Sequence, residues 1–322
     1  MLLDPCDFLR RPLPDLVGAL ASADPRDLPL PGDVLPHSPH ITAPLALDQI
    51  STVPEDARLP DDHPDIEVPG VVLEQFLGGG GQGWVYAGRV RSTNKVVAVK
   101  VLARGADVLS WGAREALLCA KVRHRNVLRV LRAEPVGAFW VVLMELVQGD
   151  ELDRGRLDPA VARTCFAQLA DALAELAKVR LVHRDVKPAN VLLRRPDRSP
   201  VLIDFGLAID LAELESYPAD VSGTPFFMAP EAYREEPPAP AWDAYALGVS
   251  AAVALAGPLP LSSDLMSLRK AKLSGTFERR VAAAVSDCPD TELRSWVTRM
   301  IADDPADRLA AVEAAREWAL IC

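Results

Sequence analysis

Three side chains that can do chemistry lie within one short stretch, from His183 to Asn190. The Asp185 carboxylate can orient a hydroxyl nucleophile, and the Lys187 ammonium can neutralise negative charge that develops on a phosphate. The amide oxygen of Asn190 can ligate Mg²⁺. Any one of these residues alone would be ordinary in a polar surface loop. Their meaning therefore depends on partners elsewhere in the chain.

A glycine-rich run provides a candidate phosphate-binding partner. Gly78, Gly80 and Gly83 satisfy the spacing G-x-G-x-x-G, and such glycines let backbone N–H groups approach phosphate oxygens closely. A dinucleotide-binding Rossmann motif would require a helix directly afterwards, but residues 84–87 are typical of a strand. No G-K-[ST] follows the glycines, which also excludes a Walker-type loop.

A strand with one lysine follows the glycine-rich run. Alternation along Val96–Lys100 predicts Ala98 and Lys100 on one face and the intervening valines on the other. The small side chain of Ala98 leaves room for an adenine ring, and the ammonium group of Lys100 can bind the phosphates of the same nucleotide. A helix is expected from about Ser110 to Val122, and Glu115 is the one acidic residue in it.

A second carboxylate follows a short apolar strand. Val201-Leu202-Ile203 leads directly into Asp204-Phe205-Gly206, 19 residues after Asp185. An Asp-Phe-Gly tripeptide is unremarkable alone, and its meaning depends on its place after this strand and on its distance from Asp185.

Taken together, these patterns resemble the eukaryotic-like serine/threonine protein kinases. The pattern H-R-D-x-K-P-x-N at 183–190 resembles the catalytic loop of that family, and Lys187-Pro188 is its serine/threonine form. Residues 78–83, 96–100, 204–206 and 223–231 resemble its glycine loop and its V-A-I-K, D-F-G and A-P-E elements. The matching motifs span residues 77–308 in the family's order.

The resemblance implies ATP and Mg²⁺ as cofactors and a set of site residues. The implied catalytic residues are Asp185, Lys187, Lys100, Glu115 and Thr224, with Asn190 and Asp204 as Mg²⁺ ligands. Lys100 would grip the α- and β-phosphates and be oriented by Glu115. The implied nucleotide-binding positions are Leu77, Gly78, Gly80, Gly83, Val85, Ala98, Lys100, Met144, Glu145, Val147 and Leu192. We expect Lys100, Asp185, Asn190 and Asp204 to meet around one metal-bound triphosphate.

The family pattern also implies supporting contacts. Thr224 is expected to hydrogen-bond near Asp185 and Lys187. Glu231 is expected to pair with Arg308 as a structural anchor. Asp243 is expected to cap the following apolar helix and to steady the catalytic loop.

The expected fold is α+β, the bilobal protein kinase fold, with a small β-rich N-lobe (70–146) and a larger helical C-lobe (147–322). Strands at 127–131 and 139–146 would complete the small sheet, and Asp158-Pro159 should open a helix.

Residues 1–69 differ from the remainder and form a Pro-rich, acidic N-terminal extension. They contain 13 of the 28 prolines, and 13 acidic residues against four basic ones. We expect this segment to be largely irregular, with one short helix at Leu13–Ala23 at most. It is either a passive tail or a docking segment for a partner or for its own kinase domain; the sequence leaves both open.

Composition and charge exclude several classes of protein. The net charge of −10 argues against nucleic acid as the main ligand. The five scattered cysteines suggest free thiols in a reducing compartment, and no signal peptide is recognisable, so a cytoplasmic protein is expected. The apolar run Ala244–Leu261 is interrupted by Gly257-Pro258 and predicts a buried helix instead of a membrane span.

The predicted function is transfer of the γ-phosphoryl group of Mg²⁺-ATP to serine or threonine hydroxyls of protein substrates, including the protein's own segment 207–222. Arg184 beside Asp185 is typical of kinases controlled by phosphorylation, so Ser216 or Ser222 is a candidate modified residue. Gln82 departs from the aromatic residue that many members carry at the glycine-loop tip. The alternatives are a pseudokinase scaffold, whose usual mark is loss of a catalytic residue, and a small-molecule phosphotransferase, which lacks the 223–231 segment.

Overall fold

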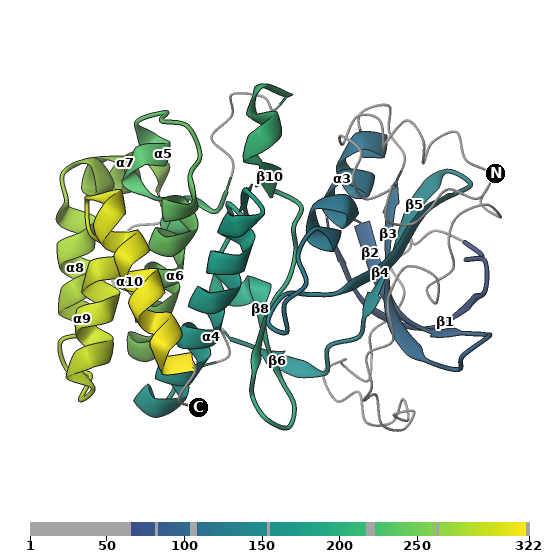
Figure 1. The fold of residues 1–322 in the computed structure, drawn as a ribbon, viewed down its shortest axis with the longest axis horizontal. Helices are drawn as coiled ribbons and strands as arrows, with labels where there is room; N and C mark the ends of the chain where they lie inside the picture. Colours follow the sequence, from purple (N-terminus) through teal and green to yellow (C-terminus); the bar gives the residue numbers. More distant parts are fainter. Residues whose placement is uncertain are drawn as a thin grey trace. The chain divides into compact units, whose positions relative to one another are not determined.

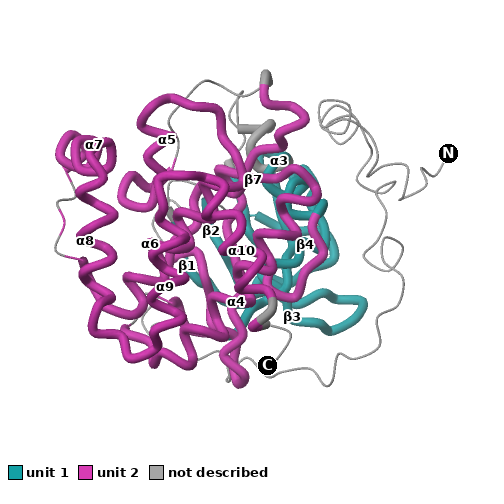
Figure 2. Tube along the Cα trace, turned by 60° about the vertical axis from the view of Figure 1, so that its left-hand side comes forward, with its two compact units in different colours: residues 1–121, 128–148 teal, residues 122–127, 149–322 magenta. Residues whose placement is uncertain are grey.

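The computed structural model describes residues 66–80, 83–103, 108–152, 155–216, 223–259, 261 and 264–319. These residues form two compact units, which Figure 2 colours separately. Unit 1 holds the described residues up to 121 together with 128–148. Unit 2 holds residues 122–127 and the described residues from 149 onward. The expected helix at Leu13–Ala23 lies outside the described residues.

Unit 1 is built on an antiparallel five-stranded sheet with the order β1-β2-β3-β5-β4 (Figure 1). Its elements are β1 (Val71–Gly80), β2 (Gly83–Val90), β3 (Val96–Ala103), α3 (Val108–Ala120), β4 (Val130–Val136) and β5 (Phe139–Glu145). Helix α3 packs against β4 and β5 and contains the expected Glu115. Valine fills four of the eight positions of the central strand β3, since its stiff, branched side chain favours a pleated surface.

One expected strand begins later than the sequence suggested. Strand β4 starts at Val130, whereas the sequence predicted a strand at 127–131. Val127 instead forms a parallel bridge with Leu202, and the Leu202 N–H donates to the Asn126 carbonyl at 2.8 Å. The β-branched Val127 is therefore extended for a reason that the local pattern does not reveal.

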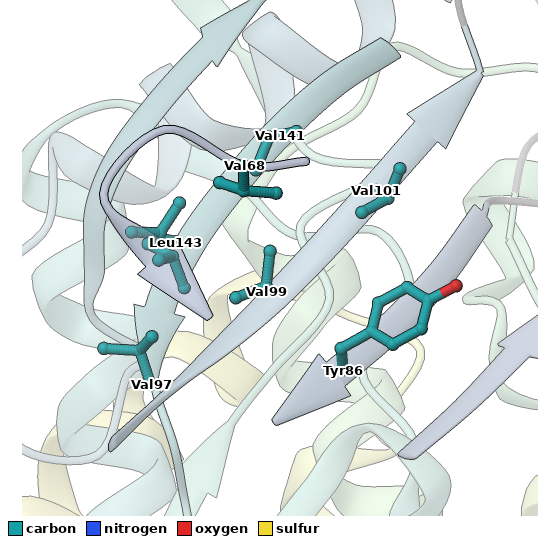
Figure 3. Packing of buried hydrophobic residues seen from close by; sticks show 8 residues of the cluster. Val68, Tyr86, Val97, Val99, Val101, Val141 and Leu143 are labelled. Atoms are coloured by element: carbon teal, nitrogen blue, oxygen red, sulfur yellow. The ribbon is translucent and has the colours of Figure 1, made fainter. Parts of the chain in front are cut away.

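The core of unit 1 lies on one face of this sheet. Figure 3 shows Val97, Val99 and Val101 of β3 beside Val141 and Leu143 of β5, all at most 2% exposed. Because successive residues of a strand point to opposite faces, Ala98 and Lys100 lie on the other face. The alternation predicted for β3 is confirmed.

Unit 2 is mainly helical. Its helices are α4 (Pro159–Lys178), α5 (Pro230–Tyr233), α6 (Pro240–Ala256), α7 (Leu265–Leu273), α8 (Thr276–Ala284), α9 (Thr291–Met300) and α10 (Pro305–Ala319). Its strands and 3₁₀ turns are β6 (Gly149–Glu151), β7 (Leu181–Val182), η2 (Pro188–Asn190), β8 (Val191–Arg194), β9 (Pro200–Leu202), β10 (Ile209–Asp210), η3 (Leu211–Ser216) and η4 (Pro225–Phe227). Helices α4, α6, α9 and α10 pack against one another (Figure 1).

Helix α4 delivers the chain toward the 183–190 loop. As predicted, Asp158 caps its N-terminus, with its carboxylate accepting from the Ala160 N–H at 2.9 Å, and Pro159 occupies the first turn. Burial of Cys165, Leu169 and other apolar residues of α4 fixes its inner face.

Helix α6 is the buried helix predicted from the apolar run, but it starts earlier, at Pro240. It ends where Gly257 takes a φ of +81°, a conformation that glycine adopts readily. The predicted cap at Asp243 is wrong: the N-cap residue is Ala239, and Asp243 lies inside the first turn. Across the described parts of both units, no helix combines the length and apolarity needed to cross a membrane.

Candidate active site

In unit 1, the glycine run forms the tip of the β1–β2 hairpin. Gly80 pairs with Gly83, and Gly78 pairs with Val85. Gly83 has a φ of +123°, and a Cβ atom added there would lie 2.2 Å from the Val101 carbonyl oxygen. Only glycine therefore fits at this position. Gly81 and Gln82 lie outside the described residues.

The lysine strand lies next to this hairpin. Lys100 of β3 pairs in register with Val85, and Ala98 pairs with Met144 of β5. The Lys100 Nζ contacts both carboxylate oxygens of Glu115, at 2.7 and 2.9 Å. The predicted Lys100–Glu115 pair is confirmed. Its side chains are only 11% and 14% exposed, so solvent screens the attraction less than on an open surface.

The remaining nucleotide-binding candidates of unit 1 are half-buried: Leu77 before the glycines, Glu145 at the end of β5 and Val147 after it. The Glu145 N–H donates to the Arg129 carbonyl at 2.9 Å.

In unit 2, three of the predicted site residues converge on Asp185. Lys187 Nζ lies 2.7 Å from Asp185 Oδ2 and 2.8 Å from Thr224 Oγ1. Thr224 donates to Asp185 Oδ1 from its hydroxyl at 2.7 Å and from its N–H at 3.1 Å. Asn190 Nδ2 donates to the Asp185 carbonyl at 2.8 Å and to Oδ2 at 2.9 Å. The predicted contacts of Thr224 with Asp185 and Lys187 are confirmed.

This network sets the charge state of Asp185. Burial would by itself raise the pKa of its carboxyl group, but hydrogen bonds from Lys187 and Thr224 outweigh burial and lower the pKa below its usual value. Asp185 is thus held as a carboxylate at neutral pH. A carboxylate in this state can accept a hydrogen bond from a hydroxyl group and orient it.

Helix α6 holds the backbone that carries Asp185. The Asp243 carboxylate accepts from the N–H of His183 at 2.6 Å and from the N–H of Arg184 at 2.9 Å. Asp243 is 3% exposed, and Arg184 takes a φ of +64°. Asp243 therefore steadies the loop, as predicted, from a position inside the helix and not from its cap.

The histidine before Asp185 links this loop to the strand that carries Asp204. The fully buried His183 ring packs edge-on against Phe205, with 4.7 Å between centroids, and its Nε2 lies 3.2 Å from the Ile203 carbonyl oxygen. The Ile203 N–H in turn donates to the Asn190 carbonyl at 2.9 Å. Asn190 and Asp204 are thereby held on adjacent backbone segments.

Asn190 and Asp204 fit a Mg²⁺ site. Because the Asn190 amide nitrogen donates to Asp185, its amide oxygen is the atom that would face a metal. Asp204 has a φ of +63°, and its Oδ1 accepts from the Gly206 N–H at 3.3 Å. One amide and one carboxylate oxygen suit Mg²⁺, which keeps waters and phosphate oxygens as its other ligands. The described residues contain no cluster of three or more His, Cys, Asp or Glu able to hold a metal.

Leu192, the remaining nucleotide-binding candidate, is half-buried in β8, where it pairs with Val201.

One residue that supports the site, Asn126, was not predicted from the sequence. Asn126 is 1% exposed, and its Nδ2 donates to the Pro200 carbonyl at 2.6 Å and lies 3.1 Å from Gln168 Oε1. It thereby holds β9, the strand that leads to Asp204. An asparagine before a valine gives no local sign of such a role.

The segment after Asp204 is anchored at both ends. Arg184 Nε donates to the Leu207 carbonyl at 2.7 Å. Arg308 is fully buried and contacts the two Glu231 carboxylate oxygens at 2.6 and 3.0 Å, so the predicted anchor pair is confirmed. Ser222 and the Ser216 side chain, the candidate modified groups, lie outside the described residues.

Comparison with known proteins agrees with this geometry. Residues 71–318 match the model of the protein kinase domain. The chain is 32% identical over 270 residues to the serine/threonine-protein kinase PkaA of Streptomyces coelicolor, covering 76% of this chain and 48% of PkaA. It is 34% identical over 203 residues to the serine/threonine-protein kinase pkn2 of Myxococcus xanthus, covering 59% of this chain and 24% of pkn2.

A fission yeast relative, the serine/threonine-protein kinase ppk25 of Schizosaccharomyces pombe, is 30% identical over 263 residues, covering 79% of this chain and 60% of ppk25. The aligned region thus spans between a quarter and three-fifths of these relatives' own lengths. The fold is that of a protein kinase domain, with a sheet-rich N-terminal part and a helical remainder. The chain belongs to the eukaryotic-like serine/threonine protein kinase family.

Proposed function

We propose that this protein is an active serine/threonine protein kinase, which transfers the γ-phosphoryl group of Mg²⁺-ATP to serine or threonine hydroxyls of protein substrates. The observation that carries the proposal is the set of hydrogen bonds around Asp185, in which Lys187, Asn190 and Thr224 all contact one carboxylate. A buried carboxylate held in this way is suited to orient an acceptor hydroxyl and to accept its proton as a general base.

Each charged group has a role that follows from its place. Lys100, oriented by Glu115, binds the α- and β-phosphates beneath the glycine hairpin. Asn190 and Asp204 hold Mg²⁺, which neutralises charge on the phosphates. Lys187 donates to the oxygen atoms of the transferring group. Because the transition state is loose, the reaction needs positioning and charge neutralisation more than covalent chemistry.

Two further parts of the proposal rest on the sequence. The segment 207–222 is a substrate of the enzyme itself, with Ser216 or Ser222 as acceptor. The acidic N-terminal extension (1–69) docks either a partner or the kinase domain. The described cysteines, Cys119, Cys165 and Cys288, are free thiols, which favours work in a reducing cytoplasm.

Transfer of label from γ-labelled ATP to a general protein acceptor tests the proposal. Wild type should label protein on serine or threonine, and Asp185→Asn should reduce this labelling by about a hundredfold or more. Asp287→Asn, an exposed change on the surface of unit 2, is the matched control and should label like wild type. A wild type that binds ATP without labelling protein would be a pseudokinase. Label found only on small molecules would contradict the proposed acceptor class.

A further inference from the structure

A buried lysine of unit 2 contacts the segment that follows Thr224. Lys272, near the end of α7, is only 2% exposed, although lysine is almost never fully buried without partners. Its Nζ donates to the Phe226 carbonyl at 2.9 Å and to the Met228 carbonyl at 2.6 Å. Both carbonyls belong to η4 or the residue that ends it.

The surroundings of Lys272 match an ammonium group closely. Its third acceptor is the Tyr245 hydroxyl at 3.3 Å, which itself lies 2.5 Å from Glu278 Oε1. The same Nζ lies over the Phe277 ring, 3.8 Å from its centroid, and over the Tyr245 ring at 4.5 Å. Three donors meet three acceptors and two aromatic faces, which offset part of the cost of burying the charge, although burial still lowers the pKa of Lys272 well below its usual value.

Along the segment 224–228, Asp185 contacts Thr224, and the contacts of Lys272 begin two residues later, at Phe226. Thr224 is tied to Asp185 and Lys187, whereas the carbonyls of Phe226 and Met228 are tied to Lys272. The Tyr233 hydroxyl donates to the Pro225 carbonyl between them, at 2.8 Å. The path of residues 224–228 is therefore fixed from the catalytic loop at one end and from α7 at the other.

We propose that Lys272 is a positioning residue for the acceptor: it sets the path of residues 224–228 so that a protein hydroxyl is presented to Asp185. This inference rests on the proposed kinase function and deepens it. Among the described residues of unit 2, the hydrogen bonds of Lys272 reach none that is assigned to ATP or Mg²⁺, so its effect should fall on the acceptor and not on the nucleotide.

The test removes the ammonium group and keeps an unbranched side chain that is one atom shorter. In Lys272→Met, two buried carbonyls lose their donor, and the 224–228 segment is free to shift. We expect kcat/KM for a protein acceptor to fall by about ten- to a hundredfold, because a displacement of about 1 Å in a positioning element has effects of this size. The KM for ATP and the slow hydrolysis of ATP without acceptor should stay within about twofold of wild type.

Two further variants keep the inference falsifiable. Lys270→Met removes an exposed lysine two residues earlier on the same helix and should leave all parameters unchanged. Tyr245→Phe removes the third acceptor of Lys272 together with the hydroxyl that donates to Glu278, and it should lower acceptor use less than Lys272→Met. If Lys272→Met fails to fold, a Tyr245→Phe enzyme with wild-type acceptor kinetics overturns the inference, and a selective rise of its acceptor KM supports it.

The outcomes separate this inference from the proposed function. Wild-type protein without phosphoryl transfer would overturn the proposed function itself. Active wild type with equal losses of acceptor phosphorylation and acceptor-free ATP hydrolysis in Lys272→Met would show a general structural role and overturn only the inference. Unchanged acceptor kinetics in a folded Lys272→Met enzyme would overturn it as well.

Discussion

The pKa of the Asp185 carboxyl group is set more by its hydrogen-bond donors than by its burial. Burial raises its pKa, and Lys187 and Thr224 reverse that effect. The lowered pKa matters for the proposed catalysis, because only the carboxylate form of Asp185 can accept a proton from an acceptor hydroxyl. A group with a lowered pKa keeps this form until the pH falls through the lowered value.

Thr224→Val tests this dependence. The change keeps the side-chain shape and removes the hydroxyl that donates to Asp185 at 2.7 Å, so the pKa of Asp185 should rise toward its usual value. We expect phosphoryl transfer to fall by about ten- to a hundredfold, since a hydrogen bond to a charged group contributes about 1.5–3 kcal/mol. The acidic limb of the kcat/KM profile should move to higher pH. Thr224→Ser keeps the hydroxyl and is the control; an unshifted limb in Thr224→Val would contradict this view of Asp185.

At the scale of elements, the strands and helices of the site are fixed by single residues at their ends. Gly83 begins β2 with a φ of +123°, and any Cβ there would collide with the Val101 carbonyl. Gly78, in β1, has open space where a Cβ would lie. The two glycines of one motif are therefore needed for different reasons.

Alanine substitutions should separate these reasons. Gly83→Ala should destabilise unit 1 by about 1–3 kcal/mol or more, because both the backbone conformation and the collision oppose it. Gly78→Ala should keep the stability of unit 1 within about 1 kcal/mol of wild type and weaken ATP binding, because the new methyl group reduces the approach to the phosphates. Chemical unfolding and an ATP titration of both variants measure the difference. Equal stability of the two would contradict the assigned role of Gly83.

Helix α6 fixes the catalytic loop through one side chain. Asp243→Ala removes the acceptor of two backbone N–H groups, those of His183 and Arg184. Each buried donor left without a partner costs about 1–3 kcal/mol, so a loss of about 2–6 kcal/mol is expected in urea unfolding. Asp243→Asn keeps one acceptor oxygen and should lose less. A stable and active Asp243→Ala protein would refute the proposed support by α6.

At the scale of the whole molecule, unit 2 is tied together by a buried ion pair. Arg308 is fully buried against Glu231 and also donates to the carbonyls of Ala302, Ala241 and Asp303. Breaking a buried pair leaves an uncompensated charge, so Glu231→Gln should destabilise unit 2 by about 3–5 kcal/mol. Hydrogen exchange at α5, α6 and α10 would report this loss.

The matched control is a pair on the surface of the same unit. Arg234 contacts Asp303 at 3.0 Å, but their side chains are 38% and 83% exposed. Arg234→Ala should therefore change stability by about 1 kcal/mol at most. If both variants lost the same stability, burial would not be what distinguishes the two pairs.

Much of the candidate site is predictable from the sequence because each motif is local. The spacing of Asp185, Lys187 and Asn190, the alternation of β3, and the apolar strand before Asp204 all follow from neighbouring residues. The pairs Lys100–Glu115 and Glu231–Arg308 required the family pattern, because 15 and 77 residues separate the partners.

The parts that the sequence did not reveal depend on distant contacts. Residues 122–127 group with unit 2 through Asn126, whose partner Pro200 lies 74 residues away. Asp243 looks like a cap from its place before an apolar run, yet α6 starts at Pro240 and uses Asp243 for the catalytic loop. Lys272 is one of several basic residues in α7, and only its burial sets it apart.

The central claim is that one set of residues binds Mg²⁺-ATP and a separate carboxylate serves the acceptor. A calorimetric titration with Mg²⁺-ATP tests it most directly, using wild type, Asp185→Asn, Asp204→Asn and Lys100→Met. We predict that wild type and Asp185→Asn bind with similar affinity, and that Asp204→Asn and Lys100→Met each bind about tenfold or more weakly. Wild type without Mg²⁺-ATP binding, or full affinity in both Asp204→Asn and Lys100→Met, would contradict the account.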